Sequence, residues 1–254
     1  MYRITSRLIF YLLLIVGVTS LSYAATVQWR RAQSDRAYTE LTSQIPDGSL
    51  DEETSTDPDE VPGEKEEYVF TYNPSLHWIN TNPDYVGWLR VEGTNIDYPL
   101  VGSKDNKDYL KLDFHRKRSD AGAIFMDYRN AGNFNDRHTV LYGHNMRNRT
   151  MFSQLDAFAS QEFFSSSPLI ELRGLYETKY YSVFSVHSVV ADDYVIQVTF
   201  NDETYETYLN SLRSLSLYES DLVFDRELGL LSLVTCSDDL RNGRLIVHAI
   251  EVRP

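Results

Sequence analysis

The stretch Leu230-Leu-Ser-Leu-Val-Thr-Cys236, together with Arg244-Leu-Ile-Val-His-Ala-Ile-Glu-Val252 shortly after it, decides how this chain folds. Each run is rich in aliphatic and β-branched residues and therefore predicts a β-strand. The polar residues Ser237-Asp238-Asp239 between the two runs predict a turn. We therefore expect two adjacent antiparallel strands, with Cys236 and Arg244 at the same end of the pair.

Short stretches of the same kind recur from Tyr85 onward, rich in Val, Ile, Tyr and Phe and separated by Gly, Asn and Asp. They predict strands at residues 86–91, 95–99, 123–127, 139–142, 169–172, 176–190, 230–236 and 244–252. Helices are expected at residues 74–79, with Asn73 as the N-cap, and at residues 151–164 and 202–215. Many short strands with frequent turns favour a barrel or a sandwich over a parallel α/β sheet. The expected fold class is mainly β with peripheral helices.

An uncharged apolar run occupies residues 8–25 near the N-terminus. As a helix it just spans a bilayer core of about 30 Å. Arg3 and Arg7 precede the run, which favours a cytoplasmic N-terminus. The alternative is a cleaved signal peptide, because Ser22 and Ala24 supply small residues at a cleavage site. Both interpretations place residue 32 onward outside the cytoplasm.

Three segments are expected along the chain. Residues 1–31 form a cytoplasmic tail and transmembrane anchor, and residues 32–67 form a polar helix followed by an acidic linker. The helix, at residues 29–45, is expected to be mostly exposed. The linker from residue 46 is expected to hold the next domain off the membrane surface or to be a plain spacer. Residues 68–254 form the folded extracytoplasmic domain.

Composition limits the function of this domain. The chain of 254 residues is 42% hydrophobic and 13% aromatic, enough to bury one sizeable core. Its net charge of -13 argues against nucleic acid as a partner, because phosphates require clustered Lys and Arg. The only cysteine, Cys236, cannot form an internal disulfide, so it is a candidate reactive thiol; an inert buried cysteine is the alternative.

Two further residues give this thiol a chemical context. The apolar run Thr139-Val-Leu-Tyr-Gly143 delivers His144 to the end of a strand. A thiol becomes nucleophilic when it loses its proton, and a nearby imidazole or guanidinium favours the thiolate. His144 is expected to exchange protons with the leaving and incoming amines, and Arg244 to stabilise an oxyanion. The other histidines show no zinc-site spacing, so neither a metal nor a cofactor is expected.

Several motifs together resemble the sortase family, and class B in particular. The run Ser232-Leu-Val-Thr-Cys236 is similar to the family signature Thr-Leu-x-Thr-Cys, and Gly243-Arg-Leu-Ile-Val-His-Ala249 carries the family arginine. Four more segments resemble class B sequences, and the similarity extends over residues 73–252. These segments are Pro83-Asp-Tyr-Val-Gly-Trp-Leu89, Ile96-Asp-Tyr-Pro-Leu-Val101, Asn106-Lys-Asp-Tyr-Leu110 and Ala121-Gly-Ala-Ile-Phe-Met-Asp-Tyr-Arg129.

The resemblance implies an eight-stranded β-barrel and a single-pass membrane enzyme with its catalytic domain outside the cell. It implies a cysteine transpeptidase that cleaves a C-terminal sorting signal after Thr and holds a thioacyl intermediate. The expected partners are surface proteins or pilins that carry the signal, and an acceptor amine of peptidoglycan peptide or of a pilin. By position, Asn106, Leu110, Tyr194 and Thr235 are expected to line the sorting-signal groove.

Two other classes of function stay open from the residues alone. The first is an anchored cysteine hydrolase that releases the acyl group to water, since hydrolysis and transfer differ only in the acceptor. The second is a non-enzymatic surface scaffold in which Cys236 is incidental. Asp238 and Asp239 are candidates either for orienting His144 or, as we favour, for closing the turn. His248 is expected to be a core histidine that bonds locally.

Overall fold

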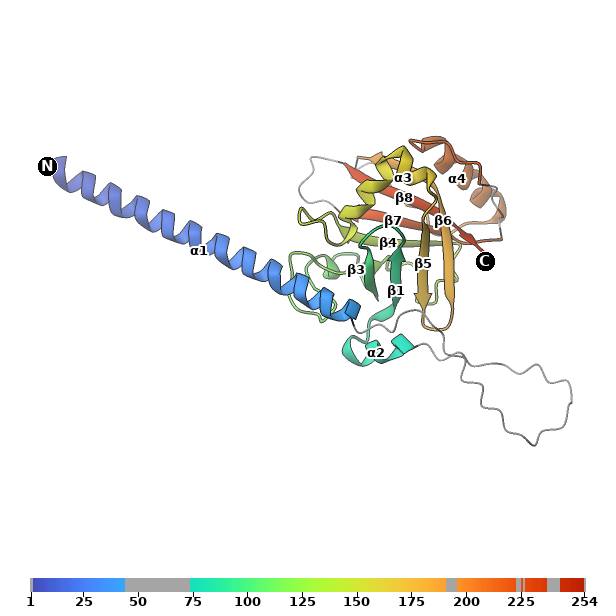
Figure 1. Cartoon of the computed structure of the whole chain (residues 1–254), viewed down its shortest axis with the longest axis horizontal. Helices are drawn as coiled ribbons and strands as arrows, with labels where there is room; N and C mark the ends of the chain where they lie inside the picture. Colours follow the sequence, from blue (N-terminus) through green and yellow to red (C-terminus); the bar gives the residue numbers. More distant parts are fainter. Residues whose placement is uncertain are drawn as a thin grey trace, which may run out of the picture.

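The computed structural model describes residues 2–43, 74–190, 196–222, 225, 227–236 and 243–253. Eight strands form a closed barrel in the order β1-β2-β3-β4-β7-β8-β6-β5, drawn in Figure 1. The strands are β1 (Tyr85–Val91), β2 (Asp97–Gly102), β3 (Ile124–Met126), β4 (His138–His144), β5 (Leu169–Gly174), β6 (Thr178–Val189), β7 (Leu230–Cys236) and β8 (Arg244–Val252). Each lies at a stretch predicted from the sequence, and the mainly β barrel is confirmed.

The order of strands in the barrel differs from their order in the chain. β7 pairs with β8 in antiparallel fashion, as the opening stretch predicts. β7 also pairs with β4, and this pair is parallel, like the pair of β2 and β3. Parallel neighbours need a long crossover connection. Here the chain between β4 and β7 includes β5, β6 and the three described helices between residues 152 and 215. The barrel therefore brings together strand ends that are distant in sequence.

Aliphatic and aromatic side chains fill the barrel. Leu89, Leu100, Leu141, Leu233 and Val247, which come from five strands, have no exposed surface. Their removal from water is the main favourable term in folding. Closing the sheet also removes unpaired strand edges. The barrel is therefore a rigid frame for the residues at its strand ends.

Short helices surround the barrel. They are η1 (Pro74–His77), α2 (Trp78–Thr81), η2 (Asp108–Leu110), η3 (Phe152–Ala159), α3 (Gln161–Ser165) and α4 (Asp202–Leu215). α4 begins with a capping box of Asn201 and Thr204, and buries Tyr205 and Leu209 against the barrel. The helix expected at residues 151–164 is instead a 3₁₀ helix and a short α-helix, because the backbone is extended at Ser160. Asn73, the expected N-cap of the first short helix, lies outside the described residues.

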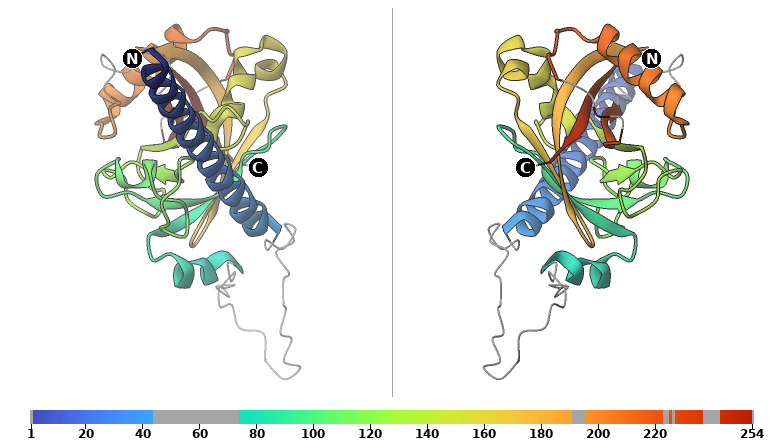
Figure 2. Two further views of the ribbon diagram at one scale, coloured as in Figure 1. Left: turned by 90° about the vertical axis from the view of Figure 1, so that its left-hand side faces the viewer. Right: turned by 90° about the vertical axis from the view of Figure 1, so that its right-hand side faces the viewer.

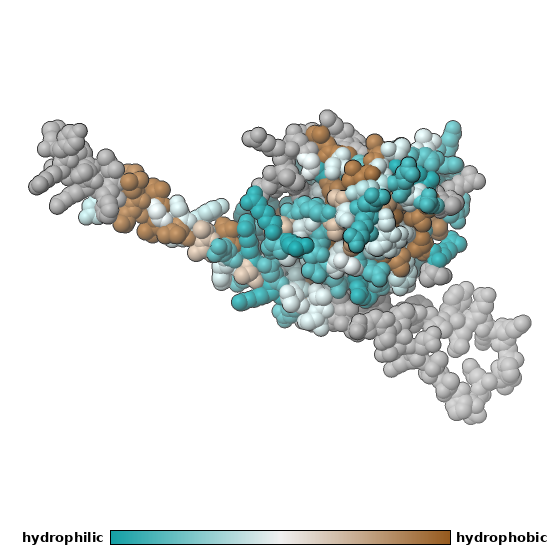
Figure 3. All heavy atoms as spheres, turned by 45° about the horizontal axis from the view of Figure 1, so that its top comes forward, coloured by the Kyte–Doolittle hydropathy of each residue, from teal (hydrophilic) through white to brown (hydrophobic). Residues whose placement is uncertain are grey.

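The N-terminal helix α1 (Tyr2–Ser43) is continuous over 42 residues, which corresponds to a length of about 63 Å. It projects from the barrel in Figure 1, and its exposed apolar side chains form the brown band in Figure 3. In the described part of the chain it is the one helix long and apolar enough to cross a membrane. Such a helix is compatible with a membrane anchor.

The last turns of α1 pack on the barrel, as the two side views in Figure 2 show. Ser34, Tyr38 and Leu41 are buried there, at the spacing of one helix face. Most residues of this polar helix are exposed, as expected, but this one face is buried. The last turns of α1 are therefore attached to the barrel by this face, and the linker expected from residue 46 lies outside the described residues.

Candidate active site

The parallel pair β4 and β7 places His144 beside Cys236. In its register, the Cα of His144 is the direct partner of the Cα of Cys236, and each residue is the last of its strand. Neighbouring strands lie about 4.8 Å apart. The two residues, which lie about half the domain apart in sequence, are therefore adjacent on the barrel.

Gly143 allows β4 to reach this position. A Cβ at Gly143 would lie 2.4 Å from Ile124 Cδ1 and 2.9 Å from two ring atoms of Phe152. Real Cβ atoms do not approach so closely, so any other residue would push β4 away from its neighbours. The glycine before His144 is required by packing.

The His144 ring is held from the loop between β2 and β3. Only 9% of His144 is exposed, and its Nε2 lies 2.8 Å from the carbonyl oxygen of Leu110. Because a carbonyl only accepts, Nε2 carries the proton and donates it. Gly122, with φ +61°, closes in on the same ring: a Cβ there would lie 3.2 Å from His144 Cδ2 and 2.5 Å from the Tyr109 carbonyl oxygen.

Arg244 begins β8, on the far side of β7 from His144. The paired register of β7 and β8 runs to Val234 opposite Ile246, and two residues further it would bring Cys236 opposite Arg244. Between these points the Thr235 hydroxyl donates to the Leu245 carbonyl and accepts from the Leu245 N–H. The side chain of Thr235 therefore replaces direct backbone pairing at this end.

The guanidinium of Arg244 is only half-buried, yet its Nε is buried and has no hydrogen-bond partner among the described residues. Other residues of the domain, such as Trp78 and Arg137, share this feature, so by itself it assigns no role to Arg244. Its position at the start of β8, next to the strand end that carries Cys236, is what makes Arg244 a candidate for the site.

Some predicted site residues lie outside the described part of the chain. They are Tyr194, Asp238, Asp239 and the side chain of Cys236. The meeting of thiol, imidazole and guanidinium therefore stays a prediction, although the backbone positions are those it requires. Among the described residues, the Leu110 carbonyl is one group that orients His144.

Asn106 and Leu110, predicted for the substrate groove, both lie near this end of the barrel. Asn106 adopts φ 58°, donates to Asp127 and accepts from the backbone N–H of Tyr128. Asp127 is buried and forms a two-point ion pair with Arg129. Burial raises the pKa of Asp127, but the hydrogen bonds from Arg129 and Tyr142 outweigh it and hold that pKa below its ordinary value.

Arg129 extends this network to the segment between β6 and α4. It donates to the carbonyl of Ile196, which follows the undescribed residues that include Tyr194. Asn106 is therefore part of a framework that joins two loops, and its contact with a substrate stays a prediction.

A second polar cluster is buried beneath α4. His138 and His248 both contact the Ser232 hydroxyl, at 2.7 Å and 2.6 Å, and both rings are completely buried. Burial lowers the pKa of His138 to about 4 and that of His248 well below its ordinary value. His248 is thus a core histidine that bonds locally, as expected. In the part of the chain that the structure describes, no group of three His, Cys, Asp or Glu side chains could hold a metal ion.

Comparison with known proteins identifies the fold and the family. The sortase domain model matches residues 89–252, more than half of the chain. The chain belongs to the sortase family. Sortase B of Staphylococcus aureus is 35% identical over 174 residues, which cover 68% of this chain and 70% of the relative. The crystal structure of Clostridium perfringens sortase B has a TM-score of 0.66 at 40% identity, covering 70% of this chain and 98% of the other.

A second solved structure, a Staphylococcus aureus sortase B–substrate complex, has a TM-score of 0.65 at 33% identity and covers 69% of this chain and 83% of the other. These relatives place the chain in class B, as the sequence motifs indicated. The chain is accordingly a cysteine transpeptidase, and the alternative of a non-enzymatic scaffold is set aside.

Sequence reasoning missed three features of the site. The Leu110 carbonyl is a backbone group, which any residue would supply. Gly122 lies inside a segment quoted for its resemblance to class B, but its contact with the His144 ring had no sequence signal. The docking of α1 had one, the helical spacing of Ser34, Tyr38 and Leu41.

Proposed function

We propose that this sortase cleaves a C-terminal sorting signal after its Thr and transfers the protein to an amine. In the first step the Cys236 thiolate attacks the carbonyl of that Thr, and a C–S bond forms. The tetrahedral adduct collapses, the C–N bond breaks, and His144 gives its proton to the departing amine. A thioester on Cys236 remains.

In the second step an acceptor amine attacks the thioester carbonyl and transfers its proton to His144. The C–S bond breaks, an amide forms and the Cys236 thiolate is regenerated. The acceptor is an amine of peptidoglycan peptide or of a pilin, and the donors are surface proteins or pilins with a sorting signal. No oxidant, metal or cofactor is needed to balance either step.

The hydrogen bond of His144 assigns the ring nitrogen that transfers the proton. Since Nε2–H donates to the Leu110 carbonyl, the neutral ring has its lone pair on Nδ1. The carbonyl dipole also stabilises the imidazolium that forms when the thiol loses its proton. Nδ1 is therefore the atom that exchanges protons with the thiol and the amines.

Arg244 has the role of oxyanion donor. Its charge is permanent, and its buried Nε–H has no partner among the described residues. The planar fork of a guanidinium can bond an oxyanion or the substrate carbonyls with defined geometry. We propose that Asn106, Leu110, Tyr194 and Thr235 line the groove for the sorting signal; the substrate complex of the Staphylococcus aureus relative supports such a groove.

The observation that carries the proposal is the pairing of His144 with Cys236 at the ends of two parallel strands. We further propose that α1 anchors the enzyme with its N-terminus in the cytoplasm and the barrel outside the cell. This orientation gives the thiol access to signals that are held at the outer membrane surface.

The test is mass spectrometry of the full chain in detergent with a library of sorting peptides, with and without added amines. We expect a thioester mass on Cys236 and an amide product cut after Thr. The Cys236→Ala variant is the matched control and should show neither. Formation of the free acid alone at saturating amine would favour the hydrolase, and the absence of any acyl adduct would refute the proposal.

A further inference from the structure

The docked end of α1 contacts two loops of the barrel. The Ser34 hydroxyl lies 3.1 Å from that of Ser119, in the loop between β2 and β3. Asp35 accepts from Asn148 Nδ2 at 3.0 Å and 3.2 Å, in the loop that follows β4. Both loops are close to His144. The loop between β2 and β3 holds its ring through the Leu110 carbonyl, and the loop after β4 begins at the residue that follows His144.

Tyr38 makes the closest connection to the first loop. Its hydroxyl donates to the Gly122 carbonyl at 2.7 Å and accepts from the Phe114 N–H at 3.3 Å. Only 7% of Tyr38 is exposed, so water has little access to replace these bonds. The loop residue that Tyr38 holds, Gly122, lies so near the His144 ring that an added Cβ would be 3.2 Å from its Cδ2.

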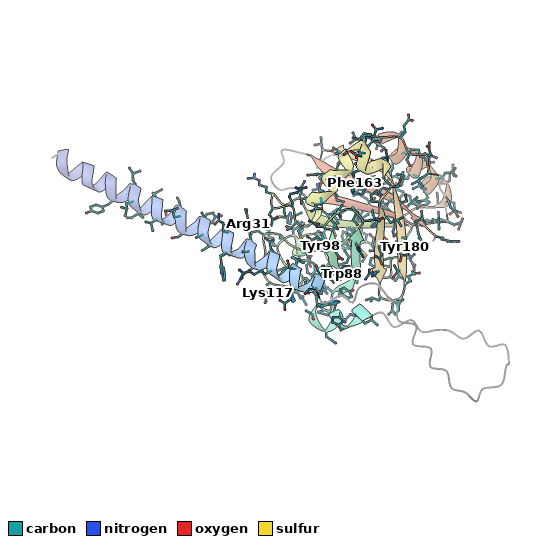
Figure 4. All side chains as sticks on the ribbon, in the orientation of Figure 1. Arg31, Trp88, Tyr98, Lys117, Phe163 and Tyr180 are labelled. Atoms are coloured by element: carbon teal, nitrogen blue, oxygen red, sulfur yellow. The ribbon has the colours of Figure 1, made fainter. Side chains whose placement is uncertain are left out.

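Tyr38 also supports the second loop. Its ring packs edge-on against Tyr98, with the centroids 5.4 Å apart. The Tyr98 hydroxyl in turn accepts from the Met151 N–H at 3.1 Å. Met151 forms a bridge with Asn145, the residue after His144, and so closes the loop. Figure 4 labels Tyr98 near the place where α1 meets the barrel.

Several polar contacts of α1 are therefore made to the two loops next to His144, while Thr42 and the ring of Tyr38 contact β2. A helix that docked only for stability would need apolar contacts such as that of Leu41, which is 3% exposed. Ser34, Asp35 and Tyr38 instead form polar bonds with the two loops that determine where the His144 ring lies. Polar bonds fix direction and distance, whereas apolar contacts do so only loosely.

We propose that the docked end of the membrane helix is part of the catalytic apparatus, with Tyr38 as a positioning residue for His144. Through Gly122 on one side and Tyr98 with Met151 on the other, Tyr38 holds the imidazole at the height of the Cys236 backbone. The inference rests on the proposed function in assigning proton transfer to His144. It adds that the docked end of α1 determines how accurately the His144 ring is placed beside Cys236.

The test uses the full chain in detergent and compares Tyr38→Phe with Leu41→Val. Tyr38→Phe keeps the ring and its packing on Tyr98 but removes the hydroxyl, whereas Leu41→Val alters only the apolar part of the same interface. We expect Tyr38→Phe to lower kcat about tenfold with KM nearly unchanged, because a small misplacement of a catalytic group is costly. Leu41→Val should lower the thermal midpoint without this loss.

A second readout does not depend on the sorting signal. Because the chain has a single cysteine, the pH dependence of its alkylation by iodoacetamide reports the ionisation of the Cys236 thiol alone. We expect a shifted profile in Tyr38→Phe and the native profile in Leu41→Val. A shifted profile in a chain that transfers no peptide would uphold this inference while refuting the proposed function.

Two results would overturn the inference. One is a native kcat and a native alkylation profile in folded Tyr38→Phe. The other is the same change in Leu41→Val as in Tyr38→Phe, which would mean that α1 contributes stability alone. If Tyr38→Phe does not fold, Asn148→Ser tests the second loop: a shifted alkylation profile supports the inference, and an unchanged one overturns it.

Discussion

The buried ring of His138 should make the stability of the barrel fall as the solution becomes acidic. The ring is completely buried and bonds the Gln197 carbonyl and the Ser232 hydroxyl. Burial lowers the pKa of His138 from 6.5 to about 4. Between these two values the unfolded chain binds a proton at this residue and the folded chain does not. The free energy of unfolding therefore decreases as the pH falls through this window.

The size of the effect follows from the two pKa values. Each unit of separation corresponds to about 1.4 kcal/mol, so the loss attributable to His138 between pH 7.5 and pH 4 approaches about 3 kcal/mol. The assay is urea unfolding of the full chain in detergent, followed by tryptophan fluorescence across that range. In His138→Gln the free energy of unfolding should be lower at pH 7.5 but should decline less steeply with acid.

A matched variant separates titration from packing. Phe200 lies 6.1 Å from the His138 ring between centroids, and Phe200→Leu removes part of this packing without removing the titrating group. We expect it to lower the free energy of unfolding by a similar amount at every pH. If His138→Gln keeps the full native slope, the neutral buried histidine is not a source of acid sensitivity and the reasoning fails.

Three further variants test the site. Cys236→Ala should abolish thioester formation yet melt cooperatively near the native temperature, because the lost group is small and lies at a strand end; loss of cooperative melting counts against the catalytic role. Arg244→Lys keeps the charge but loses the planar fork, so the decrease in kcat/KM should correspond to a loss of about 2–4 kcal/mol of transition-state stabilisation. Near-native turnover would contradict the role of Arg244 as oxyanion donor. Gly122→Ala should cost about 1–3 kcal/mol of stability, because φ is positive there and the added Cβ would meet the Tyr109 carbonyl. It should also lower kcat, because the Cβ would press on the His144 ring. Urea unfolding measures the first effect and steady-state kinetics the second, and native values in either would contradict the corresponding expectation.

Local sequence was sufficient to predict the strands but not their arrangement. Runs such as Leu230–Cys236 contain residues that favour extended backbone, so their strand character is a local property. The parallel pairing of β4 with β7 depends on how the whole sheet closes, which no local stretch encodes. The break at Ser160 was also missed, because the apolar pattern of a 3₁₀ helix followed by a short α-helix resembles that of one longer helix.

The site shows the same difference between what a residue's type reveals and what only the fold decides. Cys236, His144 and Arg244 were predicted as catalytic residues because thiol, imidazole and guanidinium groups have distinctive chemistry. The carbonyl of Leu110 escaped notice, since every residue has one and only the fold decides which is near a given ring. Tyr38 was overlooked for another reason: its neighbours are polar, and the helix was assigned to the linker rather than to the domain.

The parallel pair of β4 and β7 has a consequence for how this enzyme can diversify. A shift of one residue between the two strands would turn every side chain of one strand to the opposite surface, and the filled interior forbids that. Histidine and cysteine thus keep their alignment for as long as the barrel folds at all. Surface residues away from these two strands and their supporting loops are under no such constraint, so new substrates can be acquired by changing them while the chemistry is retained.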